Sequence, residues 1–410
     1  MDREFKDRQY KKFCLYGFIK NLQFFEPFLI FFFLESGLHY LHIGILFSIR
    51  EIATNILEIP TGLAADILGR RRTMVFSFVS YICSFLLFYF FHGFGMMIVA
   101  MIMFAFGEAF RTGTHKAMIF EYLNLKNIRH LKVAYYGHTR SWAQLGSALS
   151  ALIAAGIVFY AGSYRSVFIF TVIPYILGLF LMVSYPRELD GVVGGATAGL
   201  RARVREVLGG FASLFTTGGT RKALINSSVF DAMFKSSKDY LQPVLKVMVL
   251  ALPVFLSLEG ERRIALITGL VYCVLYILTS RAAVSAGRLA AGNLKDTSVL
   301  NGTWLLAGAL LIASGGFLAA ETAVPAVVLF ILYYMLENLR RPVMLGYVSE
   351  RIERGIMASG LSGESQVKSL FVAVFSPVLG FMADSLGVGW ALLIAGVATG
   401  LLYLFVRLKK

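Results

Sequence analysis

Charged residues are scarce in this chain of 410 residues, where aspartate, glutamate, lysine and arginine together account for 15%. A soluble domain carries about 25% of them, so the composition argues against a soluble domain. Only three cysteines occur, Cys14, Cys83 and Cys273, and each lies in or beside an apolar stretch. An odd number of cysteines in that setting predicts neither a disulfide framework nor a metal site.

Motifs for nucleotide chemistry and for catalysis are also missing. The sequence has no Walker loop, which argues against ATP-driven work, and no serine, histidine and aspartate arrangement typical of a hydrolase. We therefore expect a protein that is not an enzyme, with no catalytic residue, no cofactor and no metal.

Apolar residues are in excess instead and make up 57% of the chain, against about 45–50% in soluble domains. They fall into runs of about 20 residues, the length that crosses the hydrocarbon core of a bilayer. A segment inside lipid must satisfy its own backbone hydrogen bonds, so each run is predicted to be a helix. The twelve predicted spans are 14–35, 42–63, 74–95, 97–120, 138–160, 166–185, 224–250, 264–284, 298–319, 325–347, 365–383 and 388–407.

Basic residues gather in alternate connections between these spans. One set of connections contains Arg70, Arg71, Arg72, Lys126, Arg129, Lys132, Arg187, Arg201, Arg203, Arg205, Arg221, Lys222, Arg281, Arg288, Lys295, Arg351 and Arg354. The other set contains only Arg165, Arg262 and Arg263. The positive-inside rule therefore places the first set and both termini in the cytoplasm, and we expect a plasma membrane protein, of a bacterial inner membrane. This placement explains the net charge of +15 without a nucleic-acid partner.

The longest connection, residues 186–222, separates two sets of six spans, at 1–185 and 223–410. Apolar residues recur at helical spacing over 200–211, which is consistent with an interfacial helix or with a plain tether. Residues 56–70 align with 274–288 at seven identities in fifteen positions. Glu108, Arg111 and Glu121 match Glu337, Arg340 and Glu350 at one constant offset. Two related six-helix halves are typical of secondary transporters.

A signature loop follows the second span, in the sequence GLAADILGRRRT at residues 62–73. It resembles the loop of the major facilitator superfamily, whose pattern is matched by Gly62, Asp66, Gly69, Arg70 and Arg71. A degenerate second copy after the eighth span keeps Gly287 and Arg288 and has Val284 in place of the aspartate. Glycine at position 69 permits a tight turn.

This resemblance implies an all-α integral membrane protein with the major facilitator fold, twelve transmembrane helices in two pseudo-symmetric six-helix bundles. It also implies that the loop forms a gating latch on the cytoplasmic side. The acidic partner of the latch in that family lies at the end of the fourth span, where this chain has Glu121. The alternative is that Arg70, Arg71 and Arg72 serve only to set the topology.

Ionisable and amide side chains occur deep inside several spans, although each charge costs about 2.5–3.5 kcal/mol at a helix centre. Such residues tend to line a cavity, and most of these lie on the first, fourth, seventh and tenth spans, which line the cavity in the superfamily. The candidates for contact with solute or coupling ion are Lys20, Gln23, Glu26, Arg50, Glu51, Glu108, Arg111, Asp231, Lys235, Asp239, Gln242, Glu337 and Arg340. Opposite charges along one helix can also pair for a purely structural purpose.

Acids and bases together in the cavity fit a solute that brings its own charge. We therefore expect a monomeric secondary active transporter in a lipid bilayer that moves a small-molecule solute, polar and anionic or zwitterionic, by alternating access. Buried carboxylates make the proton the expected coupling ion. One alternative is a multidrug-type efflux antiporter of the same fold, although the fifth span lacks the glycine–proline motif of the family's antiporters. Another is a transporter-like receptor or scaffold that does not transport.

The first testable prediction concerns topology. Single cysteines placed within residues 186–222 should react only from the cytoplasm, whereas cysteines within 258–263 should react from outside, because the basic connections lie inside. The measurement is labelling of intact cells with a membrane-impermeant thiol reagent. Labelling of the connection after the second span from outside would contradict this topology.

Overall fold

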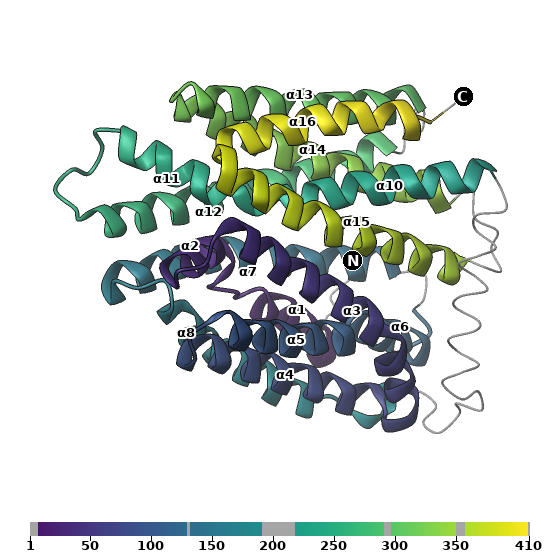
Figure 1. Ribbon diagram of the computed structural model, residues 1–410. Coiled ribbons are helices and arrows are strands. Elements are labelled where there is room, and N and C mark those ends of the chain that lie inside the picture. Colours follow the sequence, from purple (N-terminus) through teal and green to yellow (C-terminus); the bar gives the residue numbers. More distant parts are fainter. Residues whose placement is uncertain (1–6, 129–131, 191–217, 291–296, 350–356, 409–410) are drawn as a thin grey trace. The chain divides into compact units, whose positions relative to one another are not determined.

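The computed structural model describes residues 7–128, 132–190, 218–290, 297–349 and 357–408, and within these ranges every regular element is a helix (Figure 1). The α-helices of the first part are α1 (Arg8–Lys20), α2 (Leu29–Glu35), α3 (Tyr40–Leu68), α4 (Arg70–Phe90), α5 (Phe94–Arg111), α6 (Thr114–Leu125), α7 (Lys132–Ala161) and α8 (Ser166–Val183). Those of the second part are α10 (Gly218–Ser237), α11 (Leu241–Ala251), α12 (Gly260–Ala290), α13 (Thr297–Ala319), α14 (Ala323–Ser349), α15 (Met357–Leu386) and α16 (Val388–Val406). Three short 3₁₀ turns complete the list, η2 (Glu26–Phe28), η4 (Arg187–Asp190) and η5 (Lys238–Tyr240).

All twelve predicted spans coincide with helical segments of the described residues. Nine helical stretches there are long and apolar enough to cross a membrane by length and composition. The other three spans are the first, second and seventh, which carry many of the polar candidates. The first is interrupted between α1 and α2, the seventh is interrupted at η5, and α3 carries Arg50 and Glu51 near its middle.

Prolines lie beside both interruptions. Pro27 is the second residue of η2, and Pro243 lies in the first turn of α11. Proline lacks a backbone N–H and clashes with the preceding turn, so it is accommodated most easily at the start of a helix. The local sequence therefore favours a new helix at each of these two points.

The chain forms two compact units by its contacts. Unit 1 comprises Met1–Phe28, Ala53–Arg203 and Gly269–Tyr276, and unit 2 comprises Leu29–Ile52, Val204–Thr268 and Ile277–Lys410. These units follow contacts in space, whereas the boundaries expected at 185 and 223 follow the chain and stay a prediction. The interfacial helix considered at 200–211 lies outside the described residues.

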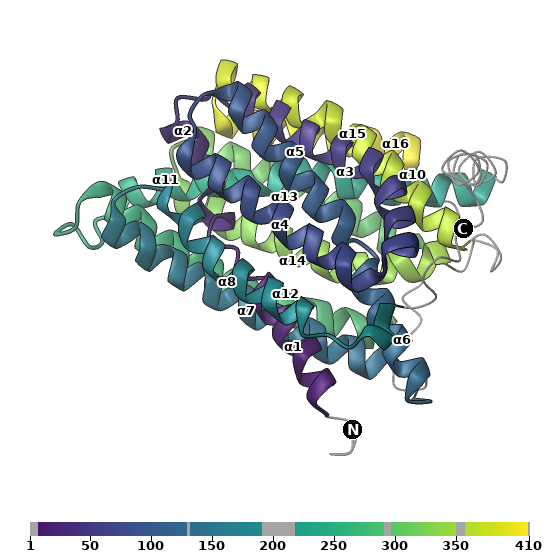
Figure 2. The same cartoon turned by 90° about the horizontal axis from the view of Figure 1, so that it is seen from below.

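Unit 1 packs aromatic rings against glycines. In it α4 lies beside α5 and α8, and α1 lies beside α7, as Figure 2 shows from a second side. Gly107 on α5 faces the ring of Tyr81, and Gly178 on α8 faces the ring of Phe78. A Cβ atom at either glycine would overlap the ring, so the missing side chain is what lets the helices approach this closely.

Unit 2 contains an equally close contact between the start of α3 and the end of α15. A Cβ atom at Gly380 would overlap the backbone of Tyr40. The Ser48 hydroxyl donates to the carbonyl of Ala373 at 3.0 Å. The carboxylate of Asp384 accepts the backbone N–H groups of Tyr40 and Leu41 at 2.9 and 2.8 Å. Asp384 therefore caps the N-terminus of α3, where an anion is favoured by the helix dipole.

The second prediction tests this contact. Gly380→Ala should lower the thermal unfolding temperature of the purified protein, because the added methyl group forces the two backbones apart at about 1–3 kcal/mol. Gly400→Ala on α16 is the matched control, since nothing lies within 4 Å of its added Cβ atom. Helix propensity alone makes that control neutral or stabilising by up to about 1 kcal/mol. Equal unfolding temperatures for the two variants would contradict the close contact.

Candidate functional site

A cluster of charged and hydroxyl groups surrounds Glu108 in unit 1. The Arg111 guanidinium lies 2.6 Å from one Glu108 carboxylate oxygen, and the ammonium of Lys20 lies 3.6 Å from the other. The Tyr81 hydroxyl donates to Glu108 at 2.5 Å and accepts from Arg111 Nε at 3.1 Å. We call Lys20, Tyr81, Glu108 and Arg111 the Glu108 cluster.

Each member of the Glu108 cluster is positioned by a simple feature of the sequence. Glu108 and Arg111 are three residues apart on α5 and so share one helix face. Lys20 is the last residue of α1, where a cation is favoured by the helix dipole. Tyr81 reaches the carboxylate because its ring lies against Gly107, the residue directly before Glu108.

The Glu108 cluster remains reachable from outside the protein. The side chains of Lys20, Glu108 and Arg111 are 12%, 23% and 27% exposed. At its edge the Gln23 amide donates to the Tyr175 hydroxyl at 2.9 Å, and that hydroxyl donates to the Lys20 carbonyl at 3.2 Å. The charge of Glu26 also acts on Lys20. Four predicted candidates, Lys20, Gln23, Glu108 and Arg111, therefore lie in one network.

A second ion pair joins α3 to α10 in unit 2. The Lys235 ammonium lies 2.6 Å from Glu51, and Arg50 Nε lies 3.7 Å from the same carboxylate oxygen. The Glu51 side chain is only 9% exposed, so the lysine compensates a charge that water does not reach. This arrangement brings three further candidates together.

Two of the remaining candidates on the seventh span, Asp239 and Gln242, have hydrogen-bond partners within the protein. Asp239 accepts from its neighbour Lys238 at 2.6 Å. Gln242 accepts the backbone N–H of Ile30 at 2.7 Å and so satisfies one of the unpaired donors at the start of α2. Asp231 lies on α10 and is half-buried.

Arg340 does not follow the arrangement of Arg111. The internal repeat places Glu337 three residues before Arg340, as Glu108 is placed before Arg111, but Arg340 forms no ion pair with Glu337 among the described residues. Arg340 Nη2 donates instead to Asn226 Oδ1 at 2.6 Å, and the guanidinium carbon lies 4.1 Å from the Phe230 ring centroid. Arg340 is 2% exposed. The neighbouring ring and amide replace part of its contact with water, whereas its Nε atom has no hydrogen-bond partner in the part of the chain that the structure describes. The polar Asn226 within the apolar seventh span could have predicted a buried hydrogen-bond partner of this kind, but it was not among the predicted candidates.

The residues of the signature loop form a second cluster in unit 1. Arg70 Nη1 lies 3.4 Å from Glu121 and 3.5 Å from the carbonyl of Ala117. Gly69 adopts φ of +90° at the N-cap of α4, a conformation that favours glycine. The latch residues Gly62 and Asp66 both lie on α3, near its end. Gly287 and Arg288 lie on α12, where their side-chain environment is outside the described part of the chain.

Asp190 belongs to this loop cluster although the sequence analysis missed it. Its carboxylate accepts the backbone N–H of Arg71 at 2.7 Å and touches Gly69. The Arg71 side chain donates to the carbonyl of Tyr185 at 3.3 Å. Glycine at the N-cap gives α4 no side-chain acceptor of its own, so a carboxylate from elsewhere satisfies the free N–H. The lack of a capping side chain at Gly69 could therefore have predicted an acceptor from elsewhere in the chain, the position that Asp190 fills.

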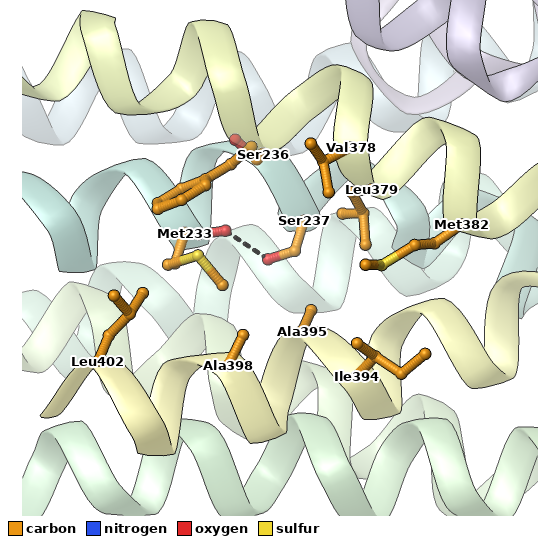
Figure 3. A pocket seen from close by; sticks show the side chains of 11 residues that line it. Met233, Ser236, Ser237, Val378, Leu379, Met382, Ile394, Ala395, Ala398 and Leu402 are labelled. Carbon is orange, nitrogen blue, oxygen red and sulfur yellow. Dashed lines mark hydrogen bonds between the residues drawn. The ribbon is translucent and has the colours of Figure 1, made fainter. Parts of the chain in front are cut away.

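Figure 3 shows a cavity of about 160 Å³ among α10, α15 and α16 of unit 2. Its lining is apolar and includes Met233, Leu379 and Ile394. The Ser237 hydroxyl at its edge donates to the carbonyl of Met233 at 2.8 Å and so is already satisfied. Ser236, which also lines the cavity, accepts a hydrogen bond from the Ser376 hydroxyl at 3.0 Å. The cavity therefore presents a mainly apolar surface to a solute. No group of three or more potential metal ligands occurs among the described residues.

Comparison with known proteins identifies the family. Residues 14–363 match the model of the Major Facilitator Superfamily, which is most of the chain. The protein belongs to the major facilitator superfamily. It is therefore a secondary transporter embedded in a membrane, with a small-molecule substrate, and the predicted all-α major facilitator fold is confirmed. A search of curated proteins found no match.

Solved structures of other transporters share this fold of the major facilitator superfamily. A variant of the nucleoside transporter NupG has a TM-score of 0.78 at 14% identity, with 98% of this chain and 99% of that chain covered. A POT family transporter in complex with 5-aminolevulinic acid has a TM-score of 0.74 at 14% identity, with 97% and 95% covered. Another, in complex with a thioalcohol-conjugated peptide, has a TM-score of 0.72 at 14% identity and the same coverage.

The third prediction concerns the ion pair of the superfamily's signature loop. Arg70→Ala and Glu121→Ala should each lower stability, and the double variant should lose less than the sum of the two. Both side chains are about a quarter exposed, so we expect a coupling of about 0.2–1 kcal/mol in a double-mutant cycle. The measurement is thermal unfolding of the purified protein.

The matched control replaces the neighbouring arginine. Arg72 belongs to the same run of three arginines but is exposed. Arg72→Ala combined with Glu121→Ala should therefore show additive losses. Additive losses for Arg70 and Glu121 as well would show that the two charges do not interact.

Proposed function

We propose that this transporter moves a small polar solute with an anionic group, anionic or zwitterionic, by alternating access coupled to protons. The observation that carries the proposal is the composition of the Glu108 cluster, in which two cations, Lys20 and Arg111, face one carboxylate. A charge inside the membrane needs a partner of opposite sign, and an incoming anion would be the partner of the second cation.

Arg111 is the group best suited to bind that anion. Its guanidinium presents two N–H groups in a planar fork that matches a carboxylate or a phosphate. Without solute, Glu108 occupies the guanidinium from the same helix. An entering anion would compete with Glu108, and the Tyr81 hydroxyl could then turn to the solute. Glu26 lies close enough to act on Lys20, so an ammonium group of a zwitterion would also find a carboxylate nearby.

The broken helices support a site near the middle of the membrane. Transporters of this kind place their substrates at discontinuous helices, whose free backbone groups meet the solute. Here α1 ends at Lys20, whose ammonium lies 3.6 Å from the Glu108 carboxylate, and α2 begins only at Leu29. The seventh span is interrupted at η5 in the corresponding position.

The solutes named for the related structures are compatible with this proposal. They are a nucleoside, a peptide conjugate and 5-aminolevulinic acid, all small and polar, and the last carries both an ammonium and a carboxylate group. We further propose a monomer in the plasma membrane with both termini in the cytoplasm. The residues 1–185 and 223–410 would be the two halves that rock about the site.

A multidrug-type efflux antiporter is the second candidate, and the apolar cavity of Figure 3 favours it. Uptake by proteoliposomes separates the candidates. A panel of radiolabelled amino acids, dipeptides, nucleosides, organic anions and lipophilic cations should be tested with and without a pH gradient. Transport of lipophilic cations alone would favour efflux. Binding of a solute without any transport would favour a receptor.

The fourth prediction tests the Glu108 cluster. Tyr81→Phe should weaken solute binding about tenfold or more, because a hydrogen bond to a charged group contributes about 1.5–3 kcal/mol. Arg111→Lys should weaken it at least as much, since lysine keeps the charge and loses the fork. The measurement is the dissociation constant of whichever solute the panel identifies.

Tyr89→Phe on the same helix is the control, since Tyr89 is outside the Glu108 cluster and should leave the affinity unchanged. Thermal unfolding of each variant shows whether the fold is retained. Wild-type affinity in both Tyr81→Phe and Arg111→Lys would remove the cluster from the binding site.

A further inference from the structure

Glu337 is a buried carboxyl group, and one of its two oxygens has no hydrogen-bond partner among the described residues. It lies on α14 in unit 2 and is 6% exposed, and its Oε2 atom has no hydrogen-bond partner. Three carboxylates are buried among the described residues, Glu51, Asp239 and Glu337. The first two have a lysine ammonium at 2.6 Å each. Within the described residues no ion pair involves Glu337.

The internal repeat allows the surroundings of Glu337 to be compared with those of an equivalent glutamate. Glu337 occupies the position that matches Glu108 in the first half of the chain. Glu108 is held by the Tyr81 hydroxyl at 2.5 Å and by Arg111 at 2.6 Å. The residue that matches Arg111 is Arg340, which is bound to Asn226 and so leaves Glu337 unpaired. Two glutamates at equivalent places in the sequence thus have opposite surroundings.

These surroundings decide the protonation of each group. An ionised carboxylate that is buried without a partner costs several kcal/mol, whereas the neutral acid costs far less. Glu108 can stay ionised because cations and a hydroxyl surround it. Glu337 has no ion pair with any described residue, and its Oε2 atom has no hydrogen-bond partner there, so the buried carboxyl group is expected to bind a proton.

Charged groups on three helices act on Glu337. Asp231 on α10 acts against ionisation, whereas Arg340 and Arg341 on α14 and Lys368 on α15 act in its favour. The cations on both α14 and α15 can stabilise the carboxylate in a state in which the proton has left. A carboxyl group that is neutral while it is shielded from water, and that can ionise once water reaches it, is suited to carry a proton across the membrane.

We propose that Glu337 is the site that binds the transported proton, while Glu108 stays ionised and holds Arg111 until the solute arrives. This assignment rests on the proposed proton-coupled transport. The only bond that changes is the O–H bond of the Glu337 carboxyl. It forms with a proton from water on the side of high proton concentration and breaks to release that proton to water on the other side.

The test uses the full-length protein in proteoliposomes. Glu337→Gln keeps the size of the side chain and cannot ionise. It should still exchange solute across the membrane, because exchange needs no net proton movement. It should lose accumulation of solute driven by a pH gradient, together with the alkalinisation of the medium that accompanies uptake.

Matched variants distinguish this role from a general defect. Glu321→Gln, at the exposed turn between α13 and α14, should retain both exchange and accumulation. Glu337→Asp should retain accumulation with a shifted pH dependence, because it keeps an acid. Glu337→Gln that accumulates solute as the wild type does would overturn the proposal.

A second measurement does not depend on the solute. Infrared difference spectroscopy of the purified protein detects the carbonyl stretch of a protonated carboxylic acid. This band should be present in the wild type at neutral pH and missing from Glu337→Gln. Identical bands in the two proteins would overturn the proposal even if transport is observed. Wild-type protein that transports no member of the panel, yet shows the difference band, would refute the proposed function and leave the proton site supported.

Discussion

A charge that lies within a bilayer has to find its partner inside the protein, and the arrangement of this chain depends on that constraint. Glu108 meets Lys20 and Arg111, and Glu51 meets Lys235. The pairs Lys20–Glu108 and Lys235–Glu51 join helices that are far apart in the sequence, so they hold helices together as well as compensate charges. Lys20 and Glu108, for example, connect the end of α1 to α5.

The same constraint explains which parts of the structure the sequence could predict. The spans were predictable because apolar runs of a given length have one solution in lipid, the helix. The pairs Glu108–Arg111 and Arg70–Glu121 were predictable because their geometry follows from a helix face or from the signature loop. Asp190 was not predicted, because its role depends on the approach of η4 to the start of α4. Nothing in the local sequence of Asp190 specifies that approach.

Arg340 shows why an internal repeat is an incomplete guide to a site. The repeat conserves the spacing of Glu337 and Arg340, but a guanidinium can be satisfied by an amide and aromatic rings as well as by a carboxylate. Asn226, together with the Phe230 ring, provides that alternative in unit 2. The choice between partners is made by side chains on other helices, which the spacing along α14 does not encode.

Within unit 2, the segment Leu29–Ile52 contacts the other helices in two ways, through an ion pair and through hydrogen bonds at helix ends. The two contacts differ in the free energy needed to break them. The Glu51 carboxylate in the ion pair with Lys235 is only 9% exposed, so separating the two residues leaves a buried charge uncompensated. The contact of Asp384 with Tyr40 and Leu41 lies at helix ends and is exposed, so water can replace either partner. At Gly380 the backbone of α15 packs closely against the backbone of α3 at Tyr40 and Leu41, and the glycine contributes no side chain to this contact. A transporter that has to open can therefore break the contact at the helix ends at little cost, whereas separating Lys235 from Glu51 leaves the buried carboxylate without its cation.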